Sequence, residues 1–422
     1  MSFILIFLDC LIELIGILMY YIFTIWRLLL LGLIIFSIHS CESNQVSNGI
    51  IEIDAYKNYP ELDLNLDDIA EISYIPLKLG KDTTLIMHSN FRPFFITEKK
   101  IFIADGNVDN PRVIVYNRSG EPLYTIGQKG RGPGELLNSI CFAVDTIGRE
   151  VFLLSPMQNR LVVYDIEGNY KRSVDFEPRL GITNIDFIND STLIGFNPKA
   201  VYSTPEWLSK DREVKKRGRT LSFIDKESLA LLDFSDFSFG RIYNGDNIWS
   251  TSTSIVNTGR GFYFFSICCD TTYFINDSLE IIPRFVDISK YPKKGEKYIF
   301  PGIETKRYIF LSSSIIFPRK PVELDEKSLK LLAYDKVDKK IYTLNRVQKK
   351  RKLDGTVIQN SPENLNLLDF MISKTLNKNY LAKYLYFSNL QKNYEILSDT
   401  LKKITDKMTE DDNPVLMLIK FK

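Results

Sequence analysis

The sequence predicts an all-β fold of the propeller type, and three observations carry this prediction. A pattern of short strands repeats at a spacing of 48 residues, tyrosine and phenylalanine are abundant, and the chain ends in an amphipathic segment followed by one apolar strand. Several short strands in a repeat of this length are typical of propeller blades, each of which is a small antiparallel sheet. Tyrosine and phenylalanine favour strands.

The N-terminal region is predicted to be a lipoprotein signal. An unbroken apolar run ends at Cys41, where Ile38 and Ser40 suit a lipidation motif and His39 is bulkier than usual. We therefore expect residues 1–40 to be a signal peptide. Residues 41–50 would then be a lipidated N-terminus and short linker. This places the protein in the cell envelope, lipid-anchored to the outer membrane and facing either the periplasm or the outside.

The first residues of the chain fit this signal poorly. A signal peptide opens with positive charge, yet Met1 to Trp26 carries only two acidic residues and no basic one. A start at Met19 gives a normal signal with Arg27 as its charge, and we expect this to be the true start. The alternative is a retained transmembrane anchor over Phe3 to Trp26, which is long enough to span a bilayer. Burial of its two acidic residues, Asp9 and Glu13, near the bilayer centre would cost free energy.

Composition narrows the classes of function. The chain carries 54 basic and 52 acidic residues, a balance that gives no electrostatic basis for a nucleic-acid partner. Apart from Cys41, the region after the signal contains Cys141 and the adjacent pair Cys268 and Cys269. Such a set predicts no disulfide framework, and we expect buried free thiols.

The repeat is clearest in the first half of the body. Residues 101–126 and 151–174 each contain a strand, a polar turn, a strand ending in tyrosine, a glycine turn and another strand. Both the tyrosines and the glycines are 48 residues apart. Fainter copies lie at 221–235, 262–286 and 308–346. A period of this size allows six or seven blades.

Two segments depart from the repeat. Residues 203–219 are polar and basic and are predicted to be an exposed insertion. Residues 387–409 are predicted to be a helix, because apolar residues recur there at helical spacing and form one stripe that we expect to pack against the propeller: Leu390, Tyr394, Leu397, Leu401, Ile404 and Met408. The final strand, 415–422, is expected to pair with an N-terminal strand and close the ring.

Three segments resemble one family in particular. GQKGRGPGEL at 127–136, CDTTYFINDSLEIIPRFVDI at 269–288 and EDDNPVLMLIKFK at 410–422 are similar to signatures of the six-bladed β-propeller lipoproteins of Bacteroidetes, relatives of NHL-repeat proteins. The resemblance implies export and an all-β, six-bladed β-propeller over residues 51–422, with a C-terminal helix and a closing strand. It implies no settled activity and supplies no catalytic residues.

The glycine-rich loop at 127–134 is the first candidate site. It lacks the Gly-Lys-Ser/Thr and the following helix of a phosphate-binding loop, so a structural turn between blades is the favoured interpretation. The functional alternative is a loop on the ligand face that presents Lys129, Arg131 and Glu135.

Histidine and carboxylate patterns limit the catalytic alternatives. The predicted exported part contains one histidine, His88, which excludes a histidine-rich metal site, and no nucleophile-elbow motif accompanies a serine. No cofactor is expected, and calcium is the alternative because it needs only oxygen ligands. Asp105, Asn107 and Asp109 are the candidate ligands, although a closing bidentate glutamate is missing.

These observations favour a non-catalytic binding or scaffold module for a peptide, glycan or protein partner. The alternative is a calcium-dependent propeller enzyme, lactonase-like or lyase-like, with a carboxylate-lined central channel. A sensor domain held by an uncleaved N-terminal helix is a third hypothesis. Aromatic residues such as Trp207, Trp249 and Phe262 are expected in blade cores, with a carbohydrate-stacking platform as the alternative.

Overall fold

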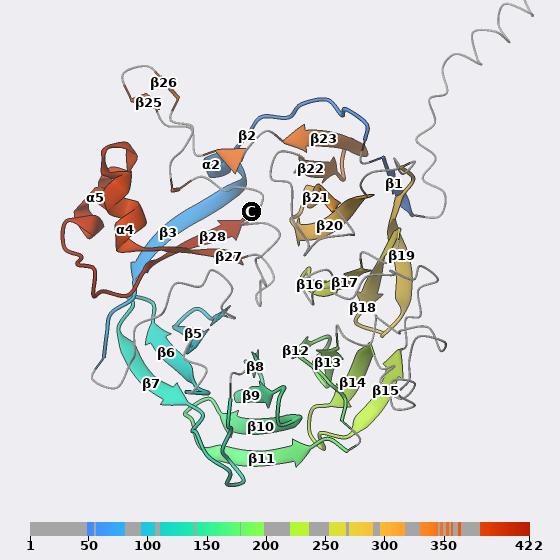
Figure 1. The fold of residues 1–422 in the computed structure, drawn as a ribbon, viewed down its shortest axis with the longest axis vertical. Helices are drawn as coiled ribbons and strands as arrows, with labels where there is room; N and C mark the ends of the chain where they lie inside the picture. Colours follow the sequence, from blue (N-terminus) through green and yellow to red (C-terminus); the bar gives the residue numbers. More distant parts are fainter. Residues whose placement is uncertain are drawn as a thin grey trace, which may run out of the picture. The chain divides into compact units, whose positions relative to one another are not determined.

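Six antiparallel sheets stand around a common axis as the blades of a propeller in the computed structural model (Figure 1). The structure describes residues 49–54, 56–80, 94–105, 110–138, 141–177, 179–197, 220–235, 253–266, 270–289, 296–316, 330–344, 347–348, 352–353, 356–357, 362–363 and 380–422. The expected all-β, six-bladed propeller with a closing strand is therefore confirmed. Residues Ile50–Lys422 make up this unit.

Blades 1 to 3 are four-stranded meanders in which the first strand lies nearest the axis. Blade 1 contains β4 (Phe94–Ile96), β5 (Lys100–Ala104), β6 (Val113–Asn117) and β7 (Pro122–Ile126). Blade 2 contains β8 (Cys141–Asp145), β9 (Glu150–Ser155), β10 (Arg160–Asp165) and β11 (Tyr170–Asp175). Blade 3 contains β12 (Asn184–Phe187), β13 (Thr192–Phe196), β14 (Leu221–Asp225) and β15 (Leu231–Ser235).

Blades 4 to 6 complete the ring. Blade 4 contains β16 (Thr253–Asn257), β17 (Gly261–Ser266), β18 (Thr271–Asn276) and β19 (Ile281–Asp287), with β1 (Ile51–Ile53) added at its outer edge. Blade 5 contains β20 (Glu296–Glu304), β21 (Tyr308–Ile316), β22 (Lys330–Asp335) and β23 (Lys340–Leu344). Blade 6 contains β27 (Tyr380–Leu385), β28 (Val415–Phe421) and β3 (Ala70–Pro76).

In each of blades 1 to 5, hydrogen bonds from the backbone to one side chain stabilise the turn of the outer hairpin. An aspartate or asparagine ends the third strand, and its Oδ1 accepts backbone N–H groups of the turn that follows. These residues are Asn117, Asp165, Asp225, Asn276 and Asp335. Aspartate and asparagine favour turns because their short side chains can bond to the backbone two or more residues on. The repeated Tyr-Asx-x-x-Gly pattern of the first two blades is the sequence motif that forms this turn.

Aromatic and aliphatic side chains fill the spaces between neighbouring blades. Phe102 of β5 and Phe142 of β8 are fully buried in the cluster between blades 1 and 2. Phe196 of β13 and Phe264 of β17 meet between blades 3 and 4, with ring centroids 6.1 Å apart in a T-shaped arrangement. Burial of these rings is the main stabilising contribution to each seam between blades.

The chain closes the ring by bringing its two ends into blade 6. β28 is paired with β27 on one side and with β3 on the other, antiparallel in both cases. The expected pairing of the last strand with an N-terminal strand is therefore confirmed.

The N-terminal segment before β3 also runs along the outer edges of two other blades. β1 lies parallel to β19, with Ile51 opposite Phe285. Glu61 then bridges to Thr343 at the edge of blade 5. β2 (Leu64–Asn65) pairs with β24 (Val347–Gln348) and leads into the short helix α2 (Leu66–Ile69). A further small hairpin joins β25 (Lys352–Leu353) to β26 (Thr356–Val357).

The single helix expected over 387–409 is divided in the structure. It consists of α4 (Phe387–Lys392), a 3-10 turn (Tyr394–Ile396) and α5 (Asp399–Thr405). Ser398 caps a new helix there, because its side chain accepts the backbone N–H of Leu401 at 3.2 Å. The apolar stripe nevertheless packs on the propeller as expected, since Leu390, Leu397 and Leu401 are buried in one cluster with β27 and β28.

Several expectations concern residues outside the described part of the chain. These are the signal peptide, the start at Met19, the lipidated Cys41 and the insertion at 203–219. Within the part of the chain that is described, no helix has both the length and the apolar character needed to cross a membrane.

Candidate functional site

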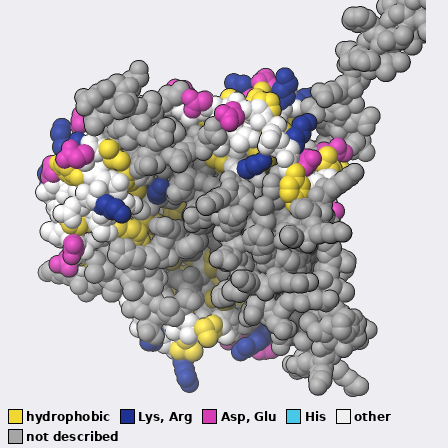
Figure 2. Space-filling view, turned by 45° about the horizontal axis from the view of Figure 1, so that its top comes forward, with side chains coloured by type: hydrophobic (Ala, Val, Ile, Leu, Met, Phe, Trp, Pro, Cys, Tyr) yellow, Lys and Arg dark blue, Asp and Glu magenta, His cyan; other side chains and the backbone are white. Residues whose placement is uncertain are grey.

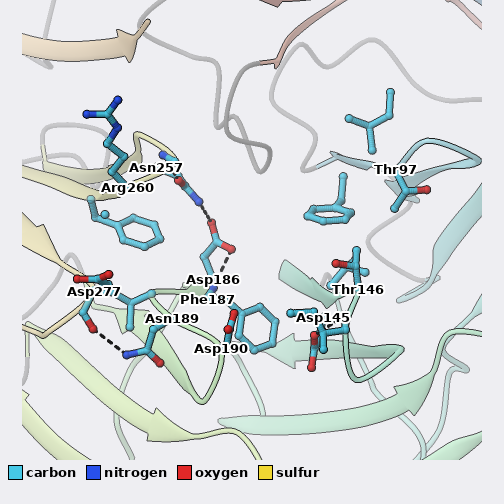
Figure 3. Close-up of a pocket in the computed structure, with 18 of the residues that line it drawn as sticks. Thr97, Asp145, Thr146, Asp186, Phe187, Asn189, Asp190, Asn257, Arg260 and Asp277 are labelled. Atoms are coloured by element: carbon cyan, nitrogen blue, oxygen red, sulfur yellow. Dashed lines mark hydrogen bonds between the residues drawn. The ribbon is translucent and has the colours of Figure 1, made fainter. Parts of the chain in front are cut away.

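A cavity of about 720 Å³ lies where the inner strands of blades 1 to 4 end. Its walls come from the segments 95–98, 144–147, 186–190, 257 and 259–262, together with Asp277 and Tyr380 (Figure 3). This volume is typical of pockets that hold small ligands or the side chains of a partner. We call this space the axial cavity.

Strand order explains why residues so far apart in sequence share one face. In a four-stranded meander, the turn after the first strand and the turn after the third strand lie at the same end of the blade. The cavity is built from first turns, such as 144–147 and 186–190, and from Asp277 in a third turn. The loop that leads to the next blade lies at the opposite end.

Asp186 is one of the two buried carboxyl groups of the cavity lining. It stands on the inner strand β12 and is 9% exposed. Its Oδ1 accepts the backbone N–H of Phe187 at 2.8 Å, and its Oδ2 accepts Nδ2 of Asn257 at 2.8 Å. Burial raises the pKa of Asp186 to about 6, although both hydrogen bonds act to lower it. This carboxyl group is therefore poised to change its protonation state near neutral pH.

The seam between blades 3 and 4 is held at the cavity by two amide side chains. Asn257, at the end of β16, reaches across to Asp186 and also accepts the backbone N–H of Gly259 at 2.7 Å. Asn189, in blade 3, donates from Nδ2 to the backbone oxygen of Asp277, in blade 4, at 2.8 Å. Figure 3 shows both bonds on one side of the cavity. These bonds fix the polar groups in place before any ligand arrives.

Asp145, at the end of β8, lies at the seam between blades 2 and 3, and its partner across this seam is a cation. Its Oδ1 accepts the N–H groups of Ile147 and Gly148 at 2.9 and 3.0 Å. Its Oδ2 accepts Nζ of Lys226, from blade 3, at 3.0 Å. The hydrogen bond to Asp145 raises the pKa of Lys226. This carboxylate is thus neutralised within the fold.

Charge around the cavity is mostly negative. Glu98, Asp190 and Asp277 are exposed at its rim, and Arg260 is the one basic residue among the described residues that line it. On the face shown in Figure 2, by contrast, acidic and basic side chains are interspersed over the described surface. The half-buried rings of Phe95 and Phe187 add apolar surface to the walls.

The glycine-rich loop lies at the opposite end of the blades from the axial cavity. It connects β7 to β8, that is, the outer strand of one blade to the inner strand of the next. Lys129 and Arg131 are exposed on it. Glu135 is turned back into the loop, where it accepts the N–H of Gly132 at 2.7 Å.

Internal contacts hold the loop in one conformation. The hydroxyl group of Tyr164 donates to the backbone oxygen of Gly134, and Arg160 donates to that of Pro133 at 2.8 Å. Gly127 has a φ of +98°, a conformation that favours glycine. These contacts are those of a structural turn between blades.

Of the three candidate calcium ligands, the structure describes Asp105. Its side chain is 1% exposed and forms an ion pair with Nε of Arg112 at 2.9 Å. Asn107 and Asp109 lie outside the described residues. The described part of the chain contains no group of three or more His, Cys, Asp or Glu residues arranged to hold a metal ion.

Of the residues that line the axial cavity, sequence reasoning singled out Phe262 but none of the polar residues. One signal was present: Asp145, Asn189 and Asn257 each stand at the end of an inner strand or within two residues of it. Aligning all the repeats would have shown that these polar residues occupy equivalent turns and therefore one face. Asp186 gave no such signal, because it lies within a strand.

Comparisons with known proteins address the fold and the family. No functionally curated protein matches the chain. A crystal structure of a Bacteroides fragilis protein classed as exported is similar, with 17% identity and a TM-score of 0.56, over 88% of this chain and 99% of that one. A Bacteroides vulgatus protein of the DUF4221 family aligns over 84% of this chain and 99% of its own, with 10% identity and a TM-score of 0.47.

The first of these likenesses confirms the expected resemblance to propeller proteins of Bacteroides at the level of the fold. The model of the family described as "Domain of unknown function (DUF4934)" matches residues 49–420, and the chain therefore belongs to this family.

Proposed function

We propose that this protein is an exported, lipid-anchored propeller that acts as a non-catalytic binding module, with the axial cavity as its ligand site. The observation that carries the proposal is the construction of the cavity. Turns from four blades converge on one volume of about 720 Å³, and their polar groups are already held by bonds across the seams. A pre-organised site of this kind binds without first having to order its own side chains.

The lining supports binding more than catalysis. None of the described residues that line the cavity is a histidine, cysteine, serine or lysine. These are the side chains that most often act as nucleophiles or as general bases near neutral pH. The buried carboxyl groups Asp145 and Asp186 have partners across the blade seams. A peptide, a glycan or a protein is the class of partner that we propose.

The proposed location rests on the N-terminal sequence. Cys41 follows an apolar run and precedes the ring by nine residues. The similarity to a Bacteroides protein classed as exported supports export of this chain as well.

A matched pair of variants tests the proposed site. Ile147 is 75% exposed and lines the cavity, whereas Val337 is 71% exposed on a turn of blade 5 outside it. The full chain in detergent would be screened against glycan arrays and peptide libraries. We expect Ile147→Trp to weaken capture of the selected ligand at least about tenfold, because the indole ring obstructs the cavity, and Val337→Trp to leave it unchanged. Equal capture by both variants would place the ligand site elsewhere.

A further inference from the structure

We infer that the axial cavity takes a cationic group, an ammonium or a guanidinium, and that Asp186 is the residue that receives it. The inference rests on the proposed role of the cavity as a binding site and names the chemical class of its ligand. The buried carboxyl groups of this protein support the inference, because most of them form an ion pair with a basic side chain.

Six carboxyl groups are buried among the described residues, and four of them pair with arginine or lysine. The four pairs are Asp105 with Arg112, Asp145 with Lys226, Glu150 with Arg172 and Asp335 with Arg307. Asp186 is bonded instead to the amide of Asn257 and to a backbone N–H. Buried charges in proteins are as a rule paired with a charge of opposite sign. Among the described residues, Asp186 thus has hydrogen-bond partners but no basic side chain as a counter-charge.

The carboxyl group also retains capacity for a ligand. An ionised carboxylate offers about four acceptor positions on its two oxygens. Phe187 and Asn257 use one position on each oxygen, and Figure 3 shows the carboxyl group among the side chains that line the cavity. A guanidinium or ammonium group in the cavity would supply both the missing charge and the further donors.

The other groups that face Asp186 agree with a cationic ligand. The charged residues of the lining are Glu98, Asp145, Asp190, Asp277 and Arg260, and Tyr380 is the titratable hydroxyl. Asp145 is neutralised by Lys226, so the rim carboxylates outnumber the single exposed arginine. The rings of Phe95 and Phe187 suit an alkyl stem or the face of a cation.

Binding of such a ligand is coupled to a proton. Burial holds the pKa of Asp186 at about 6 in the free protein, so part of the population is protonated near that pH. A cation binds the ionised form, lowers this pKa and releases the proton. Affinity should therefore fall as the pH drops through 6, and binding at pH 6 should release about half a proton per site.

Three probes separate charge from shape. N-acetyl-arginine amide and N-acetyl-citrulline amide have nearly the same shape, but only the first is charged, and spermidine represents a free amine. Titration calorimetry on the full chain in detergent at pH 7.5 should give at least about tenfold tighter binding of the arginine compound than of the citrulline compound. This factor is what a charge-assisted hydrogen bond contributes. Spermidine binding as tightly as the arginine compound would indicate a free amine as the ligand, and weaker binding would indicate a basic side chain.

Asp186→Asn should abolish the preference for arginine over citrulline, whereas Asp338→Asn, on an exposed turn of blade 5 outside the cavity, should leave it within about threefold. The unmodified chain gives a second test: affinity for the arginine compound should fall between pH 7.5 and 5, with proton release seen in buffers of different ionisation enthalpy. Equal binding of the two compounds, or a preference that persists in Asp186→Asn, would overturn the inference. If a neutral ligand is then still blocked by Ile147→Trp, the cavity is the site and only its ligand class is wrong.

Discussion

Met417 of β28 lies opposite Tyr74 of β3, so the last strand of the chain is hydrogen-bonded to one near its beginning. Met417 is fully buried in the cluster that also holds the C-terminal helices. Closure of the ring and docking of the helices therefore depend on the same apolar side chains.

Truncation of this side chain should destabilise the whole ring. Met417→Ala is expected to lower the free energy of unfolding by about 2–5 kcal/mol, because it removes buried methylene groups and leaves a cavity. Lys420→Ala, on the same strand but exposed, should change it by less than about 0.5 kcal/mol. Urea denaturation followed by circular dichroism measures both. Equal stability of the two variants would show that closure does not depend on this packing.

Asp186 should make stability depend on pH in an unusual direction. Its pKa rises from 3.8 to about 6 on folding because of burial. Between these values the folded protein binds more protons than the unfolded chain, so stability falls as the pH rises, and the full cost is present above about 6. Asp186→Asn removes this cost. Its stability relative to the natural protein should increase by roughly 2–3 kcal/mol from pH 4 to pH 7. Parallel pH profiles for the two proteins would contradict this assignment.

Glu150 should show the opposite dependence on pH. Burial acts to raise its pKa, but hydrogen bonds from Arg172 and Lys171 outweigh burial, and the pKa is lowered. Both Nη atoms of Arg172 donate to this carboxylate at 2.8 Å. Glu150→Gln should therefore cost about 2–4 kcal/mol at pH 7. The loss should shrink as the pH falls below the ordinary value of 4.5, because the natural carboxylate is then protonated too.

A matched variant at an exposed ion pair shows how much of the loss in Glu150→Gln is due to burial. Glu167 pairs with Arg149, and the two side chains are 50% and 64% exposed. Glu167→Gln should cost less than about 1 kcal/mol at any pH. Thermal unfolding of both variants at pH 7 and pH 4 makes the comparison. A loss in Glu150→Gln no larger than that in Glu167→Gln would show that blade 2 does not rely on this pair.

Gly120 should tolerate no side chain. Its φ is +84°, and a Cβ atom there would overlap the carbonyl oxygen of Pro76 at the seam between blades 6 and 1. Gly49 has nearly the same φ, +80°, with nothing within 4 Å of an added Cβ. Gly49→Ala should therefore cost only the left-handed strain of about 1–2 kcal/mol, and Gly120→Ala roughly 3 kcal/mol or more. Similar losses in the two variants would mean that Pro76 moves aside.

Cys41 should carry the lipid. We expect Cys41→Ala to abolish labelling by a fatty-acid analogue and to leave an unprocessed chain in cells. Cys141→Ala removes a buried thiol within blade 2 and should leave labelling unchanged. Labelling that persists in Cys41→Ala would reject the lipoprotein hypothesis, whatever the cavity binds.

Much of the fold could be predicted because it is encoded locally. The 48-residue spacing of Tyr116 and Tyr164 matches their equivalent places in β6 and β10, and Gly120 and Gly168 both have positive φ in the turns that follow. The break between α4 and α5 was missed, because the apolar stripe continues through it and Ser398 begins a second helix without disturbing the spacing.

The candidate site could not be predicted in the same way. The glycine-rich loop is the most distinctive motif of the sequence, and a place on the ligand face was the alternative to its favoured interpretation as a structural turn between blades. The axial cavity lies at the other end of the blades, which is decided by the order of strands within each blade and not by any motif. The two ends of a blade look alike in a sequence pattern, since each has polar turns.

The sequence by itself determined the propeller, its blade turns, the closing strand and the packed C-terminal stripe, because each depends on periodicity or on turn chemistry within a few residues. Only the tertiary structure decided that Asp186 meets Asn257, 71 residues further along the chain, across a seam between blades. It also decided that Asp145 has a lysine as its partner, whereas the partners of Asp186 among the described residues are an amide and a backbone N–H. The environment of a buried carboxyl group is set by which blades become neighbours, and that follows from closing the ring.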